Sequence, residues 1–325
     1  MSLAPTALPW QQAQWQQLIT NSGSGRLAHA LLLAGPRGVG KGHFARTFAA
    51  FMLCESPGSP TVAKPCGQCR SCIQVESGVH PNLLLLSPQD EKREIAIDDV
   101  RALIERLHLT SHYSQAKVAI ITPADSLNTS SVNALLKIIE EPPAATHLLL
   151  VAERWRALPA TLRSRCQLLR FAPPAVDEGL AWLKSQYPQQ SVDALKPLAR
   201  SPLLALTALE PEAAEARAEW GRALEDLVRT PAGSLPSLKL AQGIKRDAAQ
   251  LGLECWLQTG AAWLKQLLAP VLSSARLPEG LHPVMVSQLL TDVLAGLRGL
   301  ERNGNPALIV ESIMIRVSRG ARNPS

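Results

Sequence analysis

Five short apolar runs alternate with segments of helical periodicity in the first half of the chain. Runs of this length, bounded by glycine, proline or polar residues, are typical of buried strands. They lie at residues 29–35, 82–86, 117–122, 147–152 and 167–171. Because strands that alternate with helices form parallel sheets, the pattern predicts a mostly parallel α/β fold.

The segments between these runs carry apolar residues at helical spacing. Helices are expected at residues 10–28, 43–54, 98–109 and 130–141. Asp98 is expected to cap the third helix, and the proline pair at 142–143 should stop the fourth. Residues 55–65 are rich in proline, serine and glycine and predict a loop.

From about residue 173 onward the sequence predicts helices only. They are expected at residues 176–187, 192–208, 212–229, 248–269, 284–302 and 306–319. Proline- and glycine-rich breaks fall at Pro211, at 230–236 and at 277–283. We therefore divide the chain into an α/β domain at 1–172, a small helical domain at 173–209 and a helical bundle at 210–325.

The composition agrees with several globular domains. The chain has 325 residues, of which 46% are hydrophobic and 18% charged, as in ordinary globular proteins. No apolar run approaches the ~20 residues that span a bilayer, and the first residues lack the pattern of a signal peptide. A cytoplasmic protein without a membrane partner is expected. The net charge of +6 fits nucleic acid or an acidic partner, but mildly basic soluble proteins are nearly as common, so charge alone decides little.

Four cysteines, Cys54, Cys66, Cys69 and Cys72, follow the spacing C-x11-C-x2-C-x2-C. Two-residue spacers let thiolates converge on one ion, and four such ligands predict a closed, structural zinc site. Free thiols, an iron–sulfur cluster and, least fitting for this compartment, disulfides are the alternatives. His80 is either a substitute ligand or a residue that packs or caps beside Pro81.

The stretch GPRGVGKG at 35–42 has the form of a phosphate-binding loop between a strand and a helix. Gly35, Gly38, Gly40 and Lys41 are the candidate phosphate-binding residues. Gly42 stands where a magnesium-binding hydroxyl would be, so efficient hydrolysis is not expected. Phosphate binding by the loop amides stays open, and so does a purely structural role for the glycines.

Several segments together resemble the bacterial clamp-loader ATPase family of DNA polymerase III. They are HALLLAGPRGVGKG, the cysteine set, VHPNLLLLSP, IDDVRAL, KVAIITPADSLNTSSVNALLKIIEEPP and ALPATLRSRCQLLRFAPP. The similarity covers residues 8–172 and continues more weakly through NGNPALIVESIMIRV near the C-terminus. It implies a RecA-like AAA+ domain at 1–172 with a zinc module at 54–80, a helical lid domain at 173–209 and a helical collar domain at 210–325.

The departures from the family pattern imply a subunit that does not hydrolyse ATP. Thr122 and Pro123 replace the acidic pair after a strand, and Asp125 comes two residues late. The polar sensor position after 147–152 is occupied by Ala152-Glu153. The sensing arginine of the lid would fall near Leu203, and Arg200 does not match its register. The chain itself is therefore expected to lack ATPase and polymerase activity.

One functional element of the family is retained in Ser164-Arg165-Cys166. The resemblance implies that Arg165 acts in trans on the ATP of a neighbouring subunit, with Arg163 the competing candidate. The implied partners are the clamp-loader ATPase subunits (gamma/tau) and a delta subunit in a hetero-oligomer, and through them the sliding clamp and primed DNA. The alternatives are an ATP-hydrolysing motor subunit and a stand-alone zinc-dependent DNA-binding module.

Overall fold

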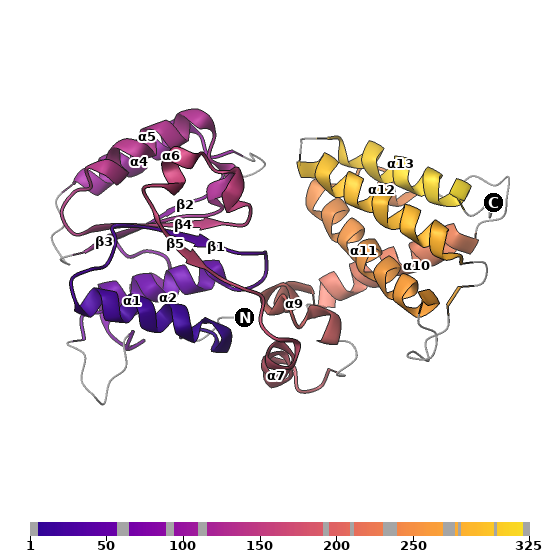
Figure 1. Cartoon of the computed structure of the whole chain (residues 1–325), viewed down its shortest axis with the longest axis horizontal. Coiled ribbons are helices and arrows are strands. Elements are labelled where there is room, and N and C mark those ends of the chain that lie inside the picture. The colour runs from indigo at the N-terminus through magenta and orange to yellow at the C-terminus, as the bar shows by residue number, and fades with distance from the viewer. Residues whose placement is uncertain are drawn as a thin grey trace. The chain divides into compact units, whose positions relative to one another are not determined.

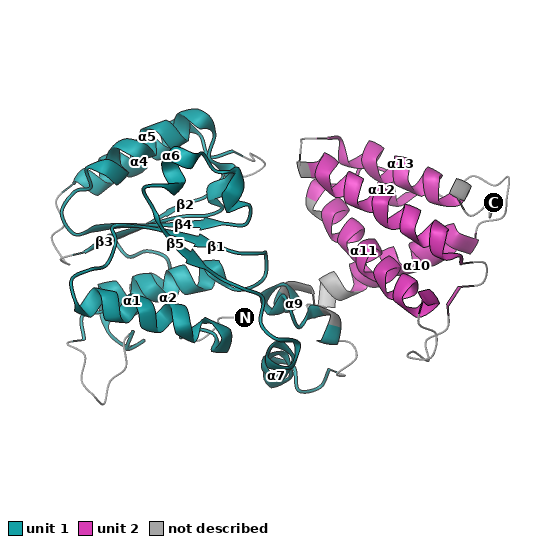
Figure 2. Cartoon of the chain, viewed as in Figure 1, with its two compact units in different colours: residues 1–206 teal, residues 207–325 magenta. Residues whose placement is uncertain are grey.

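The structure, a computed structural model, consists of two compact units, residues 1–206 and 207–325 (Figure 2). The residues that it describes are 6–56, 65–88, 94–109, 116–190, 195–208, 211–229, 239–268, 277–278, 281–301 and 304–320. The first unit contains the sheet and also residues 173–206. The finer division at residues 172 and 209 stays a prediction.

A five-stranded sheet forms the centre of the first unit (Figure 1). Its strands are β1 (Ala30–Ala34), β2 (Leu83–Leu86), β3 (Lys117–Ile121), β4 (Thr146–Ala152) and β5 (Gln167–Arg170). They follow the order β2-β3-β4-β1-β5, and all neighbouring pairs are parallel. The predicted parallel α/β fold is confirmed, with each apolar run forming a strand.

Helices cover both faces of the sheet, as Figure 1 shows. One face carries α1 (Gln12–Gly23) and α2 (Lys41–Leu53), and the other carries α4 (Ile97–His108), α5 (Thr129–Glu140) and the short α6 (Ala160–Arg163). Leu31 and Leu33 of β1 join the core on the α1/α2 side, whereas Leu32 joins the core on the α4/α5 side. Burial on both sides explains why these strands read as continuous apolar runs.

The start of α4 differs from the prediction. The N-cap residue is Ala96, without a side-chain cap, and the helix begins at Ile97. Asp98 therefore lies in the first turn together with Asp99, where a carboxylate interacts favourably with the helix dipole without capping an N–H. The prediction that Asp98 caps the helix was wrong, because Asp98 lies two residues after the N-cap position.

The prediction of a single helix at 192–208 was also wrong. The described residues contain the 3₁₀ turn η4 (Lys196–Leu198) and the separate helix α9 (Pro202–Ala208). Pro197 and Pro202 lack the N–H that a continuous helix needs at those positions, and Pro202 begins α9 instead. The preceding helix, α7, spans Val176–Gln186. Several short elements were not predicted, among them the 3₁₀ turn η1 (Pro9–Gln11) and the helix α3 (Arg70–Glu76).

The second unit is built from helices, and its described residues contain no strand. Its elements are α10 (Pro211–Arg229), η5 (Lys239–Ala241), α11 (Arg246–Leu268), α12 (Pro283–Glu301) and α13 (Pro306–Gly320). Trp220 and Trp256 meet edge to face at 5.2 Å in its core, and Trp256 Nε1 donates to Trp220 O at 2.8 Å. Among the described helices, none combines the length and apolar character that crossing a bilayer requires.

Two glycines of the second unit provide a paired test of this packing. A Cβ at Gly252 would lie 2.2 Å from the Trp220 ring, whereas a Cβ at Gly221 meets no atom within 4 Å. We expect Gly252→Ala to lower the free energy of unfolding by about 1–3 kcal/mol through overpacking. Gly221→Ala should raise it by about 0.5–1 kcal/mol because alanine favours a helix interior. Urea unfolding followed by circular dichroism measures both, and equal effects of the two changes would contradict the tight Gly252–Trp220 contact.

Candidate functional site

The glycine-rich loop joins β1 to α2 and depends on glycine for its shape. Gly38 and Gly40 have φ values of 81° and 88°, a left-handed conformation that favours glycine. A Cβ at Gly35 would lie 2.3 Å from Phe171 O, the backbone oxygen just after β5. By contrast, a Cβ at Gly42 would meet no atom within 4 Å. Packing therefore explains Gly35, Gly38 and Gly40, but it does not exclude a serine at position 42.

Residues from two distant segments bond to the backbone of this loop. The side chains of Trp10 and Gln11 both donate to Val39 O at 2.9 Å, and Gln11 also donates to Gly40 O at 3.1 Å. Gln11 is fully buried. From the other side, the backbone N–H of Leu203 in α9 donates to Gly38 O at 3.0 Å. The chain's own atoms thus hold the loop through three of its carbonyl groups.

The Lys41 side chain bonds back to its own loop. Its Nζ donates to Pro36 O at 2.7 Å, and the residue is only 5% exposed. Burial lowers the pKa of Lys41, and the nearby carboxylates of Glu153 and Asp125 partly offset this effect. The ammonium group that would serve a phosphate is here paired with a carbonyl of the loop.

The acidic residue that follows β3 binds backbone groups. The Asp125 carboxylate accepts the N–H of Glu153 at 2.6 Å and the N–H of Arg154 at 3.1 Å. It therefore fixes the segment that leaves β4. Thr122 and Pro123, which precede it, offer no carboxylate.

The two candidate arginines of the 160–170 segment have different partners. Arg165 Nε donates to Glu140 Oε1 at 2.5 Å, and its Nη1 donates to Thr161 O at 3.1 Å. The Arg165 side chain remains 41% exposed. Arg163 Nε instead donates to Leu158 O at 3.0 Å, and its guanidinium lies over the Trp155 ring. Of these two arginines, Arg165 is the one that pairs with a carboxylate in the described structure.

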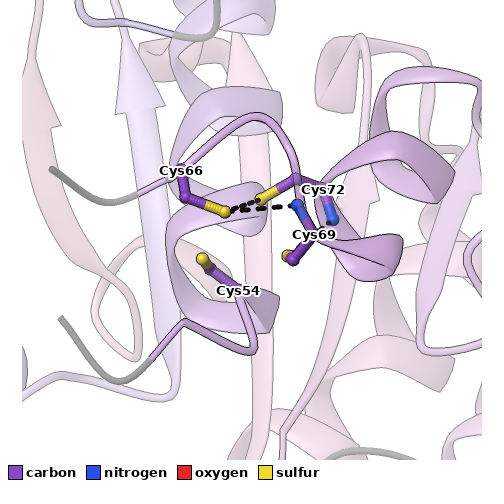
Figure 3. A group of neighbouring side chains, drawn as sticks. All are labelled: Cys54, Cys66, Cys69 and Cys72. Atoms are coloured by element: carbon purple, nitrogen blue, oxygen red, sulfur yellow. Dashed lines mark hydrogen bonds between the residues drawn. The ribbon is translucent and has the colours of Figure 1, made fainter. Parts of the chain in front are cut away.

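The four predicted cysteines come together, as Figure 3 shows. Cys54 follows α2, and Cys66, Cys69 and Cys72 come from the loop before α3 and its first turn. Their sulfur atoms all lie within 4.8 Å of one another. A tetrahedron with zinc–sulfur bonds of ~2.3 Å has sulfur atoms ~3.8 Å apart, and Cys66 Sγ lies 3.9 Å from Cys72 Sγ. The donor set and its spacing fit a four-thiolate zinc site.

Backbone N–H groups support thiolates at this site. The N–H of Cys69 donates to Cys66 Sγ at 3.3 Å, and the N–H of Cys72 donates to Cys69 Sγ at 3.4 Å. Hydrogen bonds from the backbone of Gln68 and Cys69 lower the pKa of the Cys66 thiol to about 6, whereas burial raises the pKa of Cys72. A bound metal ion would favour the thiolate at every position.

His80 does not belong to the cysteine group. Its Nδ1 accepts the N–H of Asn82 at 3.0 Å, and its Nε2 lies 2.7 Å from Ser71 Oγ. Because Nδ1 is the acceptor, Nε2 carries the proton and donates to the serine. Both imidazole nitrogens are engaged, so His80 ties α3 to the start of β2, as the capping interpretation proposed.

Three residues that contact these sites are not indicated by any local pattern in the sequence. Gln11 reaches the glycine loop across 28 positions, and Glu140 reaches Arg165 across 25. Trp10 was assigned to a helix, although it lies in η1 and donates to the loop. Contacts of this kind arise only once the sheet has brought its connections together, and no local spacing indicates them.

Comparison with known proteins identifies the family. Residues 10–175 match the family model described as DNA polymerase III, delta subunit. The delta-prime subunit of DNA polymerase III from Escherichia coli is 31% identical over 95% of this chain and 94% of its own length. The chain belongs to the delta-prime family of DNA polymerase III. Another delta-prime subunit, from Pseudomonas aeruginosa, is 37% identical over 58% of this chain, and the match spans 56% of that relative.

One further relative and one solved structure also resemble this delta-prime family member. The tau subunit from Escherichia coli is 36% identical over 47% of this chain and 23% of its own length. Among solved structures, a DNA polymerase III gamma subunit-related protein from Thermotoga maritima has a TM-score of 0.50 at 18% identity. It covers 94% of this chain and 100% of its own, and it supports the fold alone.

The cysteine geometry generates a prediction about metal content. We expect about one zinc ion per chain, bound by four thiolates. Cys69→Ser should lose the zinc and lower the melting temperature, because metal binding contributes to folding. Cys255→Ser, at a buried cysteine in the second unit, should retain the zinc and serves as the control. Elemental analysis and thermal melting of the native chain and both variants are the measurements. Native protein that contains no zinc, together with a Cys69→Ser melting temperature equal to the native one, would rule out the structural metal.

Proposed function

We propose that the chain is a non-hydrolysing subunit of the DNA polymerase III clamp-loader complex, and that it supplies Arg165 to the ATP of a neighbouring subunit. The observation that carries this proposal is a contrast between two sites. The chain's own glycine loop is bonded internally through Gln11, Leu203 and Lys41, whereas Arg165 is exposed and oriented.

Several features argue against hydrolysis at the chain's own loop. Magnesium would need a hydroxyl and a free carboxylate near the loop. Position 42 is glycine, and the Asp125 carboxylate already accepts two backbone N–H groups. The lid-side contact to Gly38 comes from Leu203, whose side chain carries no charge. The delta-prime family member is therefore proposed to assist ATP use without catalysing it.

Arg165 has the chemistry required for action in trans. A guanidinium offers a permanent charge and a fork of N–H donors that matches phosphate oxygens. Glu140 and Thr161 O engage Nε and Nη1, which leaves Nη2 for an external acceptor. The exposed Arg165–Glu140 pair is of a kind that contributes little stability, so exchange of the carboxylate for a phosphate is energetically accessible.

The rest of the chain is proposed to serve assembly. The helical residues 210–325 would form a collar domain that joins gamma/tau and delta subunits in a hetero-oligomer. Residues 173–209 would form the lid domain, and the zinc module at 54–80 would be structural. Through this assembly the chain would help place the sliding clamp on primed DNA.

The first test concerns the chain's own loop. Gly42→Ser adds the missing hydroxyl at a position with room for it. We expect no magnesium-dependent ATP hydrolysis by this variant, because Lys41, Gln11 and Asp125 keep their internal partners. Helix stability should change by less than about 1 kcal/mol. Phosphate release by the purified chain is the measurement, with Gly42→Ala as the matched control. Magnesium-dependent turnover by the native chain would instead favour the motor-subunit alternative.

The second test concerns Arg165. In the reconstituted complex, Arg165→Ala should lower clamp- and DNA-stimulated ATP turnover about 10-fold or more at the site that it serves, because a charged hydrogen bond in the transition state is lost. The Arg165→Lys complex should turn over ATP at a rate between those of the native and Arg165→Ala complexes, since lysine keeps the positive charge but lacks the forked N–H donors. Steady-state phosphate release by each complex provides the comparison.

Arg46→Ala is the control for this second test. Arg46 is an exposed arginine of α2, on the opposite face of the sheet from α6. The control complex should assemble and turn over ATP at the native rate. If Arg165→Ala left turnover at that same rate in an assembled complex, the action in trans would be disproved.

A further inference from the structure

Three arginines surround one tryptophan ring beside the exit of β4. Trp155 lies in the 3₁₀ turn η3 (Trp155–Ala157) and packs against the core on the α4/α5 side of the sheet. The guanidinium carbons of Arg156, Arg163 and Arg170 lie 5.4, 5.7 and 5.5 Å from its ring centroid. These distances are those of cation–π contacts. The group of four residues is called the Trp155 cluster below.

The charge of the Trp155 cluster is not neutralised by a carboxylate within the described residues. Other arginines form ion pairs with acids, as Arg101 does with Asp98 and Arg316 with Asp292. Within the part of the chain that the structure describes, the three arginines of the cluster form no such pair. The ring holds together a group of cations, and because like charges repel, a bound anion would stabilise this group.

Two acidic residues in this region of the chain have other roles. Glu153 carries an exposed side chain whose charge acts on Lys41 at the glycine loop. Glu140 is paired with Arg165. The Trp155 cluster is thus distinct from Arg165, whose guanidinium bonds to Glu140 and to Thr161 O.

The exposure of the cluster indicates the form of its ligand. Trp155 and Arg163 are half-buried, whereas Arg156 and Arg170 are exposed. The fixed ring and the bond from Arg163 Nε to Leu158 O hold the arginines at the surface, with donors free for external acceptors. Guanidinium forks match phosphate oxygens, and an open surface with several such forks suits a run of phosphates better than a single enclosed group.

We propose that the Trp155 cluster is a binding surface for the phosphate backbone of nucleic acid. The ring orients the guanidinium groups, and the contacts go to phosphates, so the interaction does not depend on base sequence. Each arginine that neutralises a phosphate releases condensed counterions, which makes the affinity salt-dependent.

The test uses the full-length chain and a short fluorescein-labelled DNA duplex of arbitrary sequence. Anisotropy titrations between roughly 50 and 200 mM salt give the slope of log affinity against log salt. The triple change Arg156→Gln, Arg163→Gln and Arg170→Gln should reduce the magnitude of this slope by about 2–3, because each phosphate contact accounts for about 0.9. The double change Arg156→Gln with Arg170→Gln affects only exposed side chains, and about two thirds of that reduction is expected.

A control with the same loss of charge separates the cluster from the net charge of the chain. Arg46→Gln, Arg222→Gln and Lys265→Gln remove three exposed cations that lie outside the cluster, and the native slope should persist. Equal slopes for the control and the triple variant would overturn the proposal, as would a native chain that does not bind the duplex at the lowest salt.

A third measurement checks the class of ligand. If the cluster changes weakened the binding of inorganic triphosphate but left the duplex titration unaltered, a nucleic-acid surface would be excluded. These measurements do not involve ATP turnover, so their outcome is independent of the action proposed for Arg165.

Discussion

The double-sided burial of β1 is the constraint on which the first unit depends. Every residue of this strand is buried, and it pairs with β4 on one edge and β5 on the other. The pairing continues beyond its end, where the Gly35 N–H donates to Ala152 O and the Phe171 N–H donates to Ala34 O. The glycine loop therefore leaves the sheet from a fixed point, and Lys41, Glu153 and Asp125 approach one another there.

Much of this architecture could be predicted because it is encoded locally. A strand covered on both faces must be apolar throughout, so β1 and β3 are visible as short apolar runs between helical patterns. The same reasoning failed at 192–208, where leucine and alanine periodicity concealed the effect of Pro197 and Pro202. It also missed α3, a helix of one to two turns whose N-terminus is capped by Cys69, a residue type that is not a usual cap.

The candidate sites likewise contain some features that the local sequence predicts and others that it does not. The cysteine group was predictable because three of its members lie within seven positions, and such spacing constrains the sulfur atoms directly. The resemblance to clamp loaders indicated Arg165 but not its partner, since Glu140 lies at the end of α5, 25 positions earlier in the chain. The role of Gln11 could not be predicted either, because no sequence pattern indicates that a glutamine at this position is buried against Val39 and Gly40.

The end of α5 has a consequence for Arg165. Pro142 and Pro143 stop the helix just after Glu140, so the helix ends with this carboxylate facing the 160–170 segment. Each helical residue turns the chain by ~100° about the axis. An insertion or deletion of one residue within α5 would rotate Glu140 away from the guanidinium while leaving the sheet unchanged. The length of one helix, set by two prolines, thus determines the direction in which an arginine on another element points.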